Sequence, residues 1–232
     1  MDLSDPSSRH ELARRMAELS RDIAAPRSLE QVLTDVTAAA VELIPAADVA
    51  GVLLIKAGGD FESVADTDSL AAELDKLQQE FREGPCHDAA LKQTIVRTDD
   101  LREESRWPRY APAAVERGVL SSLSFKLYTA ERTAGALNLF SFKANSWDTE
   151  AETIGTVFAA HAASAIIAGR YGQQMQSALS TRDRIGQAKG IIMERYGVDE
   201  LRAFDLLRRL SQESQVKLVD IAQRVIDTRR ED

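Results

Sequence analysis

The distribution of proline restricts the fold of this chain more than any other feature. All six prolines lie at or before Pro112, so beyond that point no proline forces a helix to break. From Trp147 onward, apolar residues recur at helical spacings of three and four, beginning with Ile154 and continuing to Ile192. This pattern predicts one long helix that ends near Tyr196 and connects two different parts of the chain.

Before this helix, strand and helix patterns are mixed. The apolar run Val49–Ile55 has strand length, and Phe61–Thr67 follows it across a glycine turn as a second strand. Val119–Tyr128 and Ala134–Phe142 pair as a hairpin, and Thr94–Thr98 is a further strand. Helices are predicted at residues 28–44, 69–81, 85–91 and 107–117. The mixture predicts an α+β domain in which helices cover one face of an antiparallel sheet.

The residues after the long helix show no strand pattern. Gly197 has the position of a C-cap, and Asp199 is the expected N-cap of a second helix. A third helix is expected from about Val216. The expected inward residues are Leu201, Phe204, Leu207 and Leu210 on the second helix and Leu218, Ile221, Ala222 and Val225 on the third. These patterns predict an all-α C-terminal domain of three helices.

Charge and the first residues mark further boundaries. The net charge is −8, but residues 1–176 carry 18 Lys/Arg against 27 Asp/Glu, whereas residues 177–228 carry 9 against 8. This change in composition indicates a domain boundary near residue 175. At the other end, residues 1–27 are expected to form a dimerisation helix. Its apolar stripe consists of Leu12, Met16, Leu19 and Ile23.

Residues that carry catalytic chemistry are sparse. Cys86 is the single cysteine, which excludes an internal disulfide and a multi-cysteine zinc site, and the three histidines are scattered. Cys86 and His87 are sequence neighbours, but on a helix they point about 100° apart and form no dyad. Cys86 is either a small core residue or, in the first turn of a helix, a redox-sensitive thiol. His161 is expected to be packed. We expect no metal site and no enzymatic activity.

The sequence shows neither the pattern of a membrane span nor that of a signal peptide. No apolar run approaches the roughly 20 residues that a membrane span needs. Residues 1–20 carry charges throughout, unlike the core of a signal peptide. We therefore expect a cytoplasmic protein.

Two glycines inside the long helix are the most informative detail of the C-terminal domain. Gly186 and Gly190 are four residues apart, so they share one face, and each costs about 0.5–1 kcal/mol relative to alanine. They create a notch beside Lys189 that something must approach closely. The occupant is either another helix of the bundle or a phosphate backbone or base steered by Lys189, Arg182 and Arg184. The spacing does not separate these alternatives.

The C-terminal domain resembles the ANTAR domain over nearly its whole length, which assigns residues 173–232 to that family. The matching residues are Arg184-Ile185-Gly186-Gln187-Ala188-Lys189-Gly190, Ala203-Phe204, Leu207-Arg208, Lys217-Leu218 and Asp220-Ile221-Ala222. The resemblance implies a three-helix RNA-binding unit that acts in transcription antitermination. Its RNA partners would be tandem stem-loops in nascent leader transcripts, each hairpin closed by a hexanucleotide loop.

The resemblance also carries site residues onto this chain. It implies RNA contacts by Arg184, Gln187, Lys189 and Gly190 on the first helix, by Arg208 on the second, and by Lys217 before the third. Ala203, Phe204 and Leu218 are expected in the core. With few aromatic residues, the module is expected to lack a stacking platform for single strands. This chain departs from the family pattern at two positions. Gln215, expected to cap the start of helix three, stands where the family usually has asparagine, and Val219 stands where it often has arginine.

The preceding segment resembles a GAF sensor domain, which assigns residues 28–172 to that family and implies the fold of a GAF-like antiparallel sheet with flanking helices. The matching residues are Glu83-Gly84-Pro85-Cys86, Asp99-Asp100-Leu101, Arg106-Trp107-Pro108 and Gly135-Ala136-Leu137-Asn138-Leu139. The sequence leaves the input open between a nucleotide, haem, a small metabolite, a redox state and a partner protein, and an empty, purely structural GAF domain is a further alternative. The cofactor is therefore unknown.

Together the two resemblances indicate a bacterial transcription antitermination regulator that works as a homodimer under control of its GAF domain. One alternative is a DNA-binding regulator that uses the last two helices as a helix-turn-helix. Another is a ligand-regulated interaction module without RNA binding. A GAF-type redox enzyme would need at least two cysteines. The RNA hypothesis requires an open glycine notch, and a sealed notch with Lys189 bound to a carboxylate would contradict it.

Overall fold

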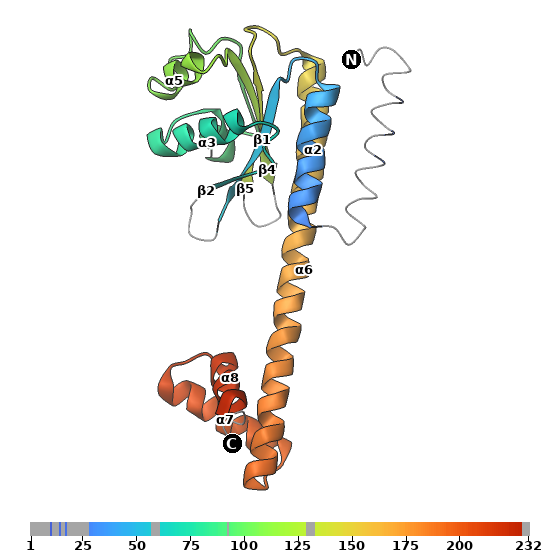
Figure 1. Ribbon diagram of the computed structural model, residues 1–232, viewed down its shortest axis with the longest axis vertical. Coiled ribbons are helices and arrows are strands. Elements are labelled where there is room, and N and C mark those ends of the chain that lie inside the picture. Colours follow the sequence, from blue (N-terminus) through green and yellow to red (C-terminus); the bar gives the residue numbers. More distant parts are fainter. Residues whose placement is uncertain are drawn as a thin grey trace. The chain divides into compact units, whose positions relative to one another are not determined.

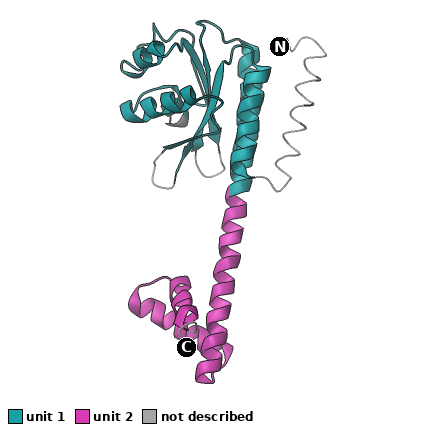
Figure 2. Cartoon of the chain, viewed as in Figure 1, with its two compact units in different colours: residues 1–169 teal, residues 170–232 magenta. Residues whose placement is uncertain are grey.

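The computed structural model describes residues 28–56, 61–91, 93–128 and 133–228, together with His10, Arg14 and Ala17 (Figure 1). The chain divides into two compact units, Met1–Gly169 and Arg170–Asp232 (Figure 2). We call them the N-terminal unit and the C-terminal unit. The predicted apolar stripe of the first helix lies outside the described residues, namely Leu12, Met16, Leu19 and Ile23.

The first described helix, α2 (Leu29–Leu43), begins at a capping box. The Ser28 hydroxyl accepts the backbone N–H of Gln31, at 3.2 Å, and the Gln31 side chain accepts the backbone N–H of Ser28, at 3.0 Å. Two otherwise unpaired donors of the first turn are thereby satisfied. One face of α2 is fully buried, as the apolar spacing predicts.

Five strands form one sheet in the order β2-β1-β5-β4-β3, and every neighbouring pair is antiparallel. They are β1 (Val49–Ile55), β2 (Phe61–Val64), β3 (Ile95–Thr98), β4 (Ser121–Tyr128) and β5 (Thr133–Ser141). The predicted hairpin is β4–β5, in which Leu123 lies opposite Leu139. The α+β prediction is confirmed.

Helices cover both faces of this sheet, so the prediction of one covered face was wrong. On one face, α2 and the beginning of α6 lie side by side (Figure 1) and pack with Leu137 and Leu139 of β5. The opposite face carries Ala136 and Phe140 and packs against α3 (Ser69–Phe81), α4 (Pro85–Leu91) and α5 (Tyr110–Glu116). Because successive strand residues point to opposite faces, both sets of β5 side chains are buried.

Helix α6 runs from Thr149 to Tyr196, 48 residues without a break, as the proline distribution predicts. Its first part packs on the sheet so closely that a Cβ on Gly155 would lie 2.2 Å from Cζ of Phe125. An 18-residue window of α6 reaches a mean hydropathy of 1.3, enough by length and composition for a membrane span, contrary to the sequence-based expectation. However, 56% of that window is buried within the protein, as expected for a core helix.

The C-terminal unit combines the end of α6 with α7 (Glu200–Ser214) and α8 (Leu218–Thr228). Gly197 ends α6 with φ +60°, a conformation that glycine adopts without strain, and the Asp199 carboxylate caps α7 by accepting the N–H of Arg202 at 2.8 Å. Both caps are as predicted. The core of this unit contains Ala188, Ile192, Ala203, Leu207, Ile221 and Ala222.

Three residues expected inward on α7 are exposed instead. Leu201 is 80% exposed, Leu210 is 48% exposed and Phe204 is 37% exposed, whereas Leu207 is fully buried. With only the end of α6 and the short α8 to pack against, α7 buries the narrow stripe formed by Ala203 and Leu207. The apolar residues on either side of that stripe stay at the surface.

Gln215 has a different role from the one expected. It ends α7 in the left-handed conformation, with φ 53°, and is not the N-cap of α8, which begins at Leu218. Asparagine and glycine adopt this conformation most readily, so the family preference for asparagine here fits a C-cap. The Ser211 hydroxyl donates to the carbonyl oxygen of Val216 at 2.6 Å and closes the same turn.

Candidate nucleic-acid interface

The glycine notch of α6 is open. Gly186 and Gly190 each lie two residues from Ala188, which is fully buried, and two helical residues are separated by about 200°. Both glycines therefore face away from α7 and α8. A Cβ added to either would meet nothing within 4 Å among the described residues. The notch is not a packing site for a neighbouring helix of its own bundle.

A shallow groove of about 900 Å³ runs beside this notch, and we call it the α6 groove. It belongs entirely to the C-terminal unit. Most of its lining comes from α6, and one aromatic ring comes from α7. The lining residues are Gln174, Ser177, Ala178, Thr181, Arg182, Asp183, Ile185, Gly186, Gln187, Lys189 and Phe204. The groove thus combines basic, polar and apolar contacts in one surface.

Lys189 lines the groove but is already paired. Its ammonium donates to the Glu200 carboxylate at the start of α7, and its side chain is only 22% exposed. This hydrogen bond is the main reason that the pKa of Glu200 lies below its ordinary value. A sealed notch with Lys189 bound to a carboxylate would contradict RNA binding. In the structure Lys189 is bound to a carboxylate, but the notch is open.

Phe204 and Arg208 extend this surface along α7. Glu200, Phe204 and Arg208 follow one another at intervals of four residues, so they lie on one face of the helix. Phe204 lines the groove, and Arg208 lies one turn further on with 61% of its side chain exposed. Arg208 lies 3.6 Å from Asp205, a loose surface pair. Lys189, Phe204 and Arg208 therefore occupy one side of the α6–α7 pair.

The other predicted contacts are more dispersed. Gln187 lines the groove, whereas Arg184 is exposed and donates to the Ser180 hydroxyl at 3.1 Å. Gly190 and Lys217 are exposed, but neither is among the groove's lining residues. The groove therefore brings Gln187 and Lys189 together and leaves the remaining predicted residues outside it.

Phe204 is the contact that sequence reasoning missed. It was expected in the core, yet it supplies an exposed ring beside two basic side chains, Arg182 and Lys189. Ala203 and Leu207 form the buried stripe, and Phe204 lies about 100° around the helix from Ala203 and about 60° from Leu207, at the edge of the buried face. That spacing was the available signal. The groove thus contains one aromatic ring, and the expected absence of a stacking platform for single strands stays a prediction.

A second groove of about 820 Å³ lies between the end of α6, α7 and α8, and we call it the apolar groove. Its floor is mainly aliphatic, and arginines lie around it. The lining residues are Ile191, Ile192, Arg195, Tyr196, Val198, Arg202, Leu206, Leu210, Ser214, Ile221, Arg224, Val225 and Thr228. It shares no residue with the α6 groove.

Helix α6 also carries an exposed apolar stripe. Ile167, Tyr171, Met175 and Leu179 recur at intervals of four, and each is between 45% and 67% exposed. Side chains four residues apart on a helix are neighbours, so these residues form a continuous strip. Such a strip is typical of a helix that packs against a partner.

The residues that resemble the GAF motif hold the fold of the N-terminal unit. The Glu83 carboxylate accepts the backbone N–H groups of Arg109 and Tyr110, at 2.9 and 3.4 Å, and so caps α5. The hydrogen bond from Arg109 is the main reason that the pKa of Glu83 is lowered. The predicted helix at residues 107–117 therefore begins later, at Tyr110, and the Trp107 indole donates to Asp88 at 3.1 Å.

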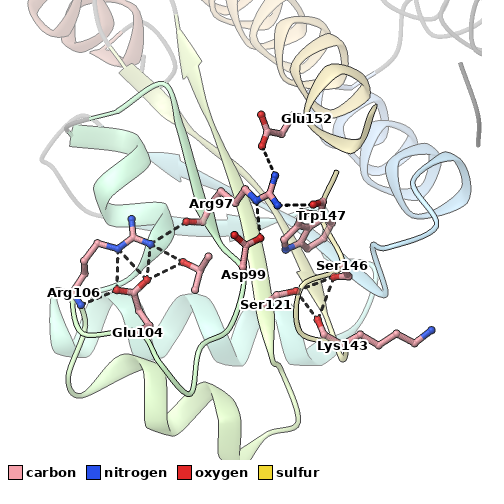
Figure 3. A network of polar contacts seen from close by, with 10 residues as sticks. Arg97, Asp99, Glu104, Arg106, Ser121, Lys143, Ser146, Trp147 and Glu152 are labelled. Carbon is pink, nitrogen blue, oxygen red and sulfur yellow. Dashed lines mark hydrogen bonds and ion pairs between the residues drawn. The ribbon is translucent and has the colours of Figure 1, made fainter. Parts of the chain in front are cut away.

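Arg97 links the sheet edge to the start of α6, as Figure 3 shows. Its guanidinium donates to Asp99 at 2.7 Å, to Glu152 in the first turn of α6 at 2.9 Å, and to the carbonyl oxygen of Trp147 at 2.6 Å. These hydrogen bonds, that to Glu152 foremost, raise the pKa of Arg97. A displacement of β3 would therefore be transmitted through Arg97 to the first turn of α6, the helix that continues into the C-terminal unit.

Within the part of the chain that the structure describes, no group of three His, Cys, Asp or Glu side chains could hold a metal ion. Cys86 is fully buried, and burial raises the pKa of its thiol well above the ordinary value. This is the opposite of the lowered pKa that a redox-sensitive thiolate needs. The structure therefore favours the alternative of a core cysteine.

Comparison with known families assigns both units. Residues 26–167 match the GAF domain, and residues 173–226 match the ANTAR domain. A search of curated proteins returned no match.

Solved structures share the fold at low identity. The GAF domain of a phosphoenolpyruvate-protein phosphotransferase from Coxiella burnetii is 19% identical, with a TM-score of 0.58 over 70% of this chain and 96% of that one. A phytochrome photosensory core module from Stigmatella aurantiaca is 12% identical, with a TM-score of 0.59 over 89% and 46%. Free methionine-R-sulfoxide reductase from Neisseria meningitidis, solved with its substrate, is 14% identical, with a TM-score of 0.52 over 69% and 91%.

The GAF match covers more than half of the chain, and the ANTAR match begins shortly after it ends. The five-stranded sheet flanked by helices and the helical C-terminal unit correspond to these two matches. The chain therefore belongs to the GAF family and joins its GAF domain to a C-terminal ANTAR domain, the architecture of a GAF-regulated regulator of the antitermination type.

Proposed function

We propose that the ANTAR domain of this protein binds paired hexaloop hairpins in nascent leader transcripts, and that it binds them through the α6 groove. The observation that carries this proposal is the open groove in which Lys189, Gln187 and the exposed ring of Phe204 lie beside a glycine notch. A folded RNA loop presents phosphates, polar base edges and base faces close together. The groove offers a contact for each.

Each contact has a distinct task. Arg182, Lys189 and Arg208 attract the phosphates, and Gln187 offers an amide to a base edge. The Phe204 ring stacks on an unpaired base of the loop, an interaction worth about 1–3 kcal/mol per base. Gly186 lets the RNA approach the α6 backbone, since an added Cβ would occupy the open space beside it.

Because Lys189 is paired with Glu200, RNA binding requires Lys189 to exchange this carboxylate for an RNA phosphate. The lysine leaves a carboxylate when it contacts a phosphate, and Glu200 then points at solvent. The Glu200 side chain is 70% exposed, so its release needs no rearrangement of the core. A single domain is therefore expected to bind weakly.

Two copies of the chain compensate for weak single contacts. The exposed α6 stripe of Ile167, Tyr171, Met175 and Leu179 supports a homodimer in which two α6 helices pack together. Two ANTAR domains then meet the two hairpins of one transcript, and the second contact benefits from a raised effective concentration. The protein acts in the cytoplasm, where nascent transcripts are made, and it has no enzymatic activity.

The continuous helix α6 carries the signal. It begins against the GAF sheet, where Arg97 binds Glu152, and its last turns contribute Ile192 to the ANTAR core. A small-molecule ligand or another input to the GAF domain biases the packing at the start of this helix.

A second candidate function is that of an interaction module without RNA binding. The apolar groove favours it, because aliphatic residues such as Leu206 and Val225 line an open surface. Binding of RNA through the α6 groove leaves this second surface free. The two candidates therefore predict different sensitive residues.

The test compares the full chain binding to a paired-hairpin RNA and to duplex DNA of equal length at the same salt concentration. Tight binding to RNA alone is expected, and equal binding to both would favour the helix-turn-helix alternative. Phe204→Ala is expected to weaken RNA binding about ten-fold. Arg208→Ala should weaken it and reduce the salt dependence by about one phosphate contact.

Two further variants sharpen the result. Arg209→Ala is the matched control, since Arg209 is exposed on the same helix but lies beside the Glu200–Phe204–Arg208 face. Glu200→Gln frees Lys189 and is expected to tighten RNA binding a few-fold. Unchanged RNA affinity in Phe204→Ala, Lys189→Ala and Arg208→Ala would contradict the α6 groove as the binding site.

A further inference from the structure

A row of polar residues interrupts the sheet face that α3, α4 and α5 cover. Asn138 on β5 lies opposite Gly51 of β1 and opposite Ser124 of β4. The surrounding residues of this face, among them Leu53 and Phe140, are apolar and buried. Asn138 and Ser124 are themselves fully buried. Of this row, the Asn138 amide nitrogen finds a partner on α3, whereas Asn138 Oδ1 and Ser124 Oγ have no hydrogen-bond partner among the described residues.

The main partner is Asp75 of α3, which is fully buried. Its Oδ1 accepts from Asn138 Nδ2 at 3.1 Å and from Gln78 Nε2 at 3.2 Å. Its Oδ2 lies 2.7 Å from the Ser63 hydroxyl of β2. No Lys, Arg or His side chain pairs with Asp75 among the described residues. A buried carboxyl group with only neutral donors has little to stabilise a negative charge.

A second carboxyl group shares the same serine. The Ser63 hydroxyl also lies 3.0 and 3.1 Å from the two carboxylate oxygens of Asp66. When both carboxyl groups are ionised, one hydroxyl proton faces two acceptors. One additional proton resolves this: Asp75 donates to Ser63, and Ser63 donates to Asp66. Asp75, Ser63 and Asp66 can therefore bind one proton in addition to the hydroxyl proton of Ser63.

The backbone is shaped to bring Asp66 to this place. A Cβ on Gly51 would lie 2.4 Å from Oδ1 of Asp66, so a side chain at this position would require the carboxyl group to shift. Asp66 is thus held beside the sheet and within reach of Ser63.

The electrostatic surroundings point in the same direction. Burial, and next to it the charge of Asp66, raise the pKa of Asp75 to about 7, against hydrogen bonds from Ser63 and Asn138 that lower it. Burial also raises the pKa of Asp66. The other titratable groups that face Asp75 are the thiol of Cys86 on α4 and the phenol of Tyr110 on α5, and both stay neutral because their pKa values are raised.

We propose that Asp75, Ser63 and Asp66 form a proton-binding site that makes the packing of α3 on the GAF sheet respond to pH near neutrality. With the proton bound, a hydrogen-bonded chain joins α3, β2 and the segment after β2. When the proton leaves to solvent, Asp75 carries an uncompensated charge inside the N-terminal unit, and the contact between α3 and β2 weakens.

The direction of the pH dependence follows from linkage. Asp75 holds its proton to a higher pH in the folded state than in the unfolded chain, so it contributes stability at low pH. This contribution is lost as the pH rises toward about 7. Above that pH the contribution of Asp75 no longer changes.

The test uses the full chain and follows the carboxyl ¹³C signal of Asp75 across pH, assigned by its loss in Asp75→Asn. A titration midpoint within about one pH unit of neutrality is expected, and Ser63→Ala should move it upward because the charged form loses a donor. Glu80→Gln, which removes an exposed carboxyl group of the same helix, is the matched control and should leave the midpoint unchanged. A midpoint below about pH 5 would overturn the proposal.

Hydrogen exchange provides the second readout, because it does not depend on RNA binding. Amides of α3 and β2 should exchange several-fold faster at pH 8 than at pH 6, after correction for the intrinsic rate. Asp75→Asn, which cannot ionise, should abolish that difference and match the slower, low-pH behaviour. Equal protection of the α3 amides at both pH values in the unmodified chain would overturn the proposal that the packing of α3 responds to pH.

Discussion

The two units of the chain differ in how completely they bury their apolar residues. The N-terminal unit has a core on each face of its sheet and encloses large side chains such as Trp107, Phe125 and Phe158 almost entirely. The core of the C-terminal unit is built from small and aliphatic residues, and Tyr196 and Leu201 are 66% and 80% exposed. The tightly packed N-terminal unit is suited to sensing an input. The C-terminal unit, which exposes apolar side chains, is suited to binding a partner.

One helix makes this difference visible, because α6 contributes to both cores. Gly155 lies where the helix meets the sheet, and a Cβ there would overlap the Phe125 ring. A Cβ on Gly186 or Gly190 would contact none of the residues that the structure describes. The same residue type thus allows close packing in one unit and leaves a surface uncovered in the other. Four substitutions test how far this contrast extends.

The largest effect is expected from Leu207→Ala in the small C-terminal core. Leu207 is fully buried, so the cavity should cost about 2–5 kcal/mol and unfold the C-terminal unit while the GAF domain stays folded. Hydrogen exchange resolved by segment measures the two units separately. Leu210→Ala, on the exposed side of the same helix, is the control and should have a small effect. Simultaneous loss of protection in both units would break the contrast.

Gly155→Ala should destabilise the N-terminal unit by about 1–3 kcal/mol, because the added methyl group lies 2.2 Å from a buried ring atom. The melting temperature of that unit reports the change. Gly172→Ala is the matched control on α6, since a Cβ there meets no described residue within 4 Å. The control should raise helix stability by up to about 1 kcal/mol. Equal melting temperatures for the two variants would show that the sheet yields to α6.

Arg97→Lys tests the link between the sheet and α6. Lysine retains the charge but cannot reach Asp99, Glu152 and the Trp147 carbonyl together, so a loss of about 1–2 kcal/mol is expected. Faster exchange of the amides in the first turns of α6 is the measurement. Arg102→Lys serves for comparison, because Arg102 pairs with the nearby Asp100 on the surface. If both variants behave alike, Arg97 is only a surface charge.

Gly186→Ala should have the smallest effect on stability and the opposite sign. Alanine at this exposed helical position is expected to stabilise the C-terminal unit by about 0.5–1 kcal/mol. The same methyl group stands at the notch, so RNA affinity should fall while stability rises. A gain in stability with full RNA affinity would assign the glycine to neither packing nor binding.

Features set by neighbours in sequence were predictable. The period of the apolar residues predicted the strands, α6 and the helical end of the chain. Local cap chemistry predicted the roles of Ser28, Asp199 and Gly197. These features depend on a few consecutive residues, and their physical rules are local.

Contacts across the fold were not predictable in the same way. Glu200, the partner of Lys189, lies beyond a turn on another helix, and nothing in the spacing marks it. The polar cluster of Asp75 joins residues from α3, β2 and β5. The exposure of Phe204 depends on how little surface α7 can bury. Each of these depends on which elements pack together, which a single sequence pattern does not state.

The bond between Lys189 and Glu200 changes what competes with a transcript for this protein. A free lysine exchanges dissolved counterions for phosphate, whereas this lysine exchanges a tethered carboxylate that dilution cannot remove. Moderate salt therefore has two opposing effects. It weakens the Lys189–Glu200 pair, and it also screens the attraction between the lysine and the RNA phosphates. The affinity of this regulator should consequently tolerate changes in cellular ionic strength better than its number of basic residues implies.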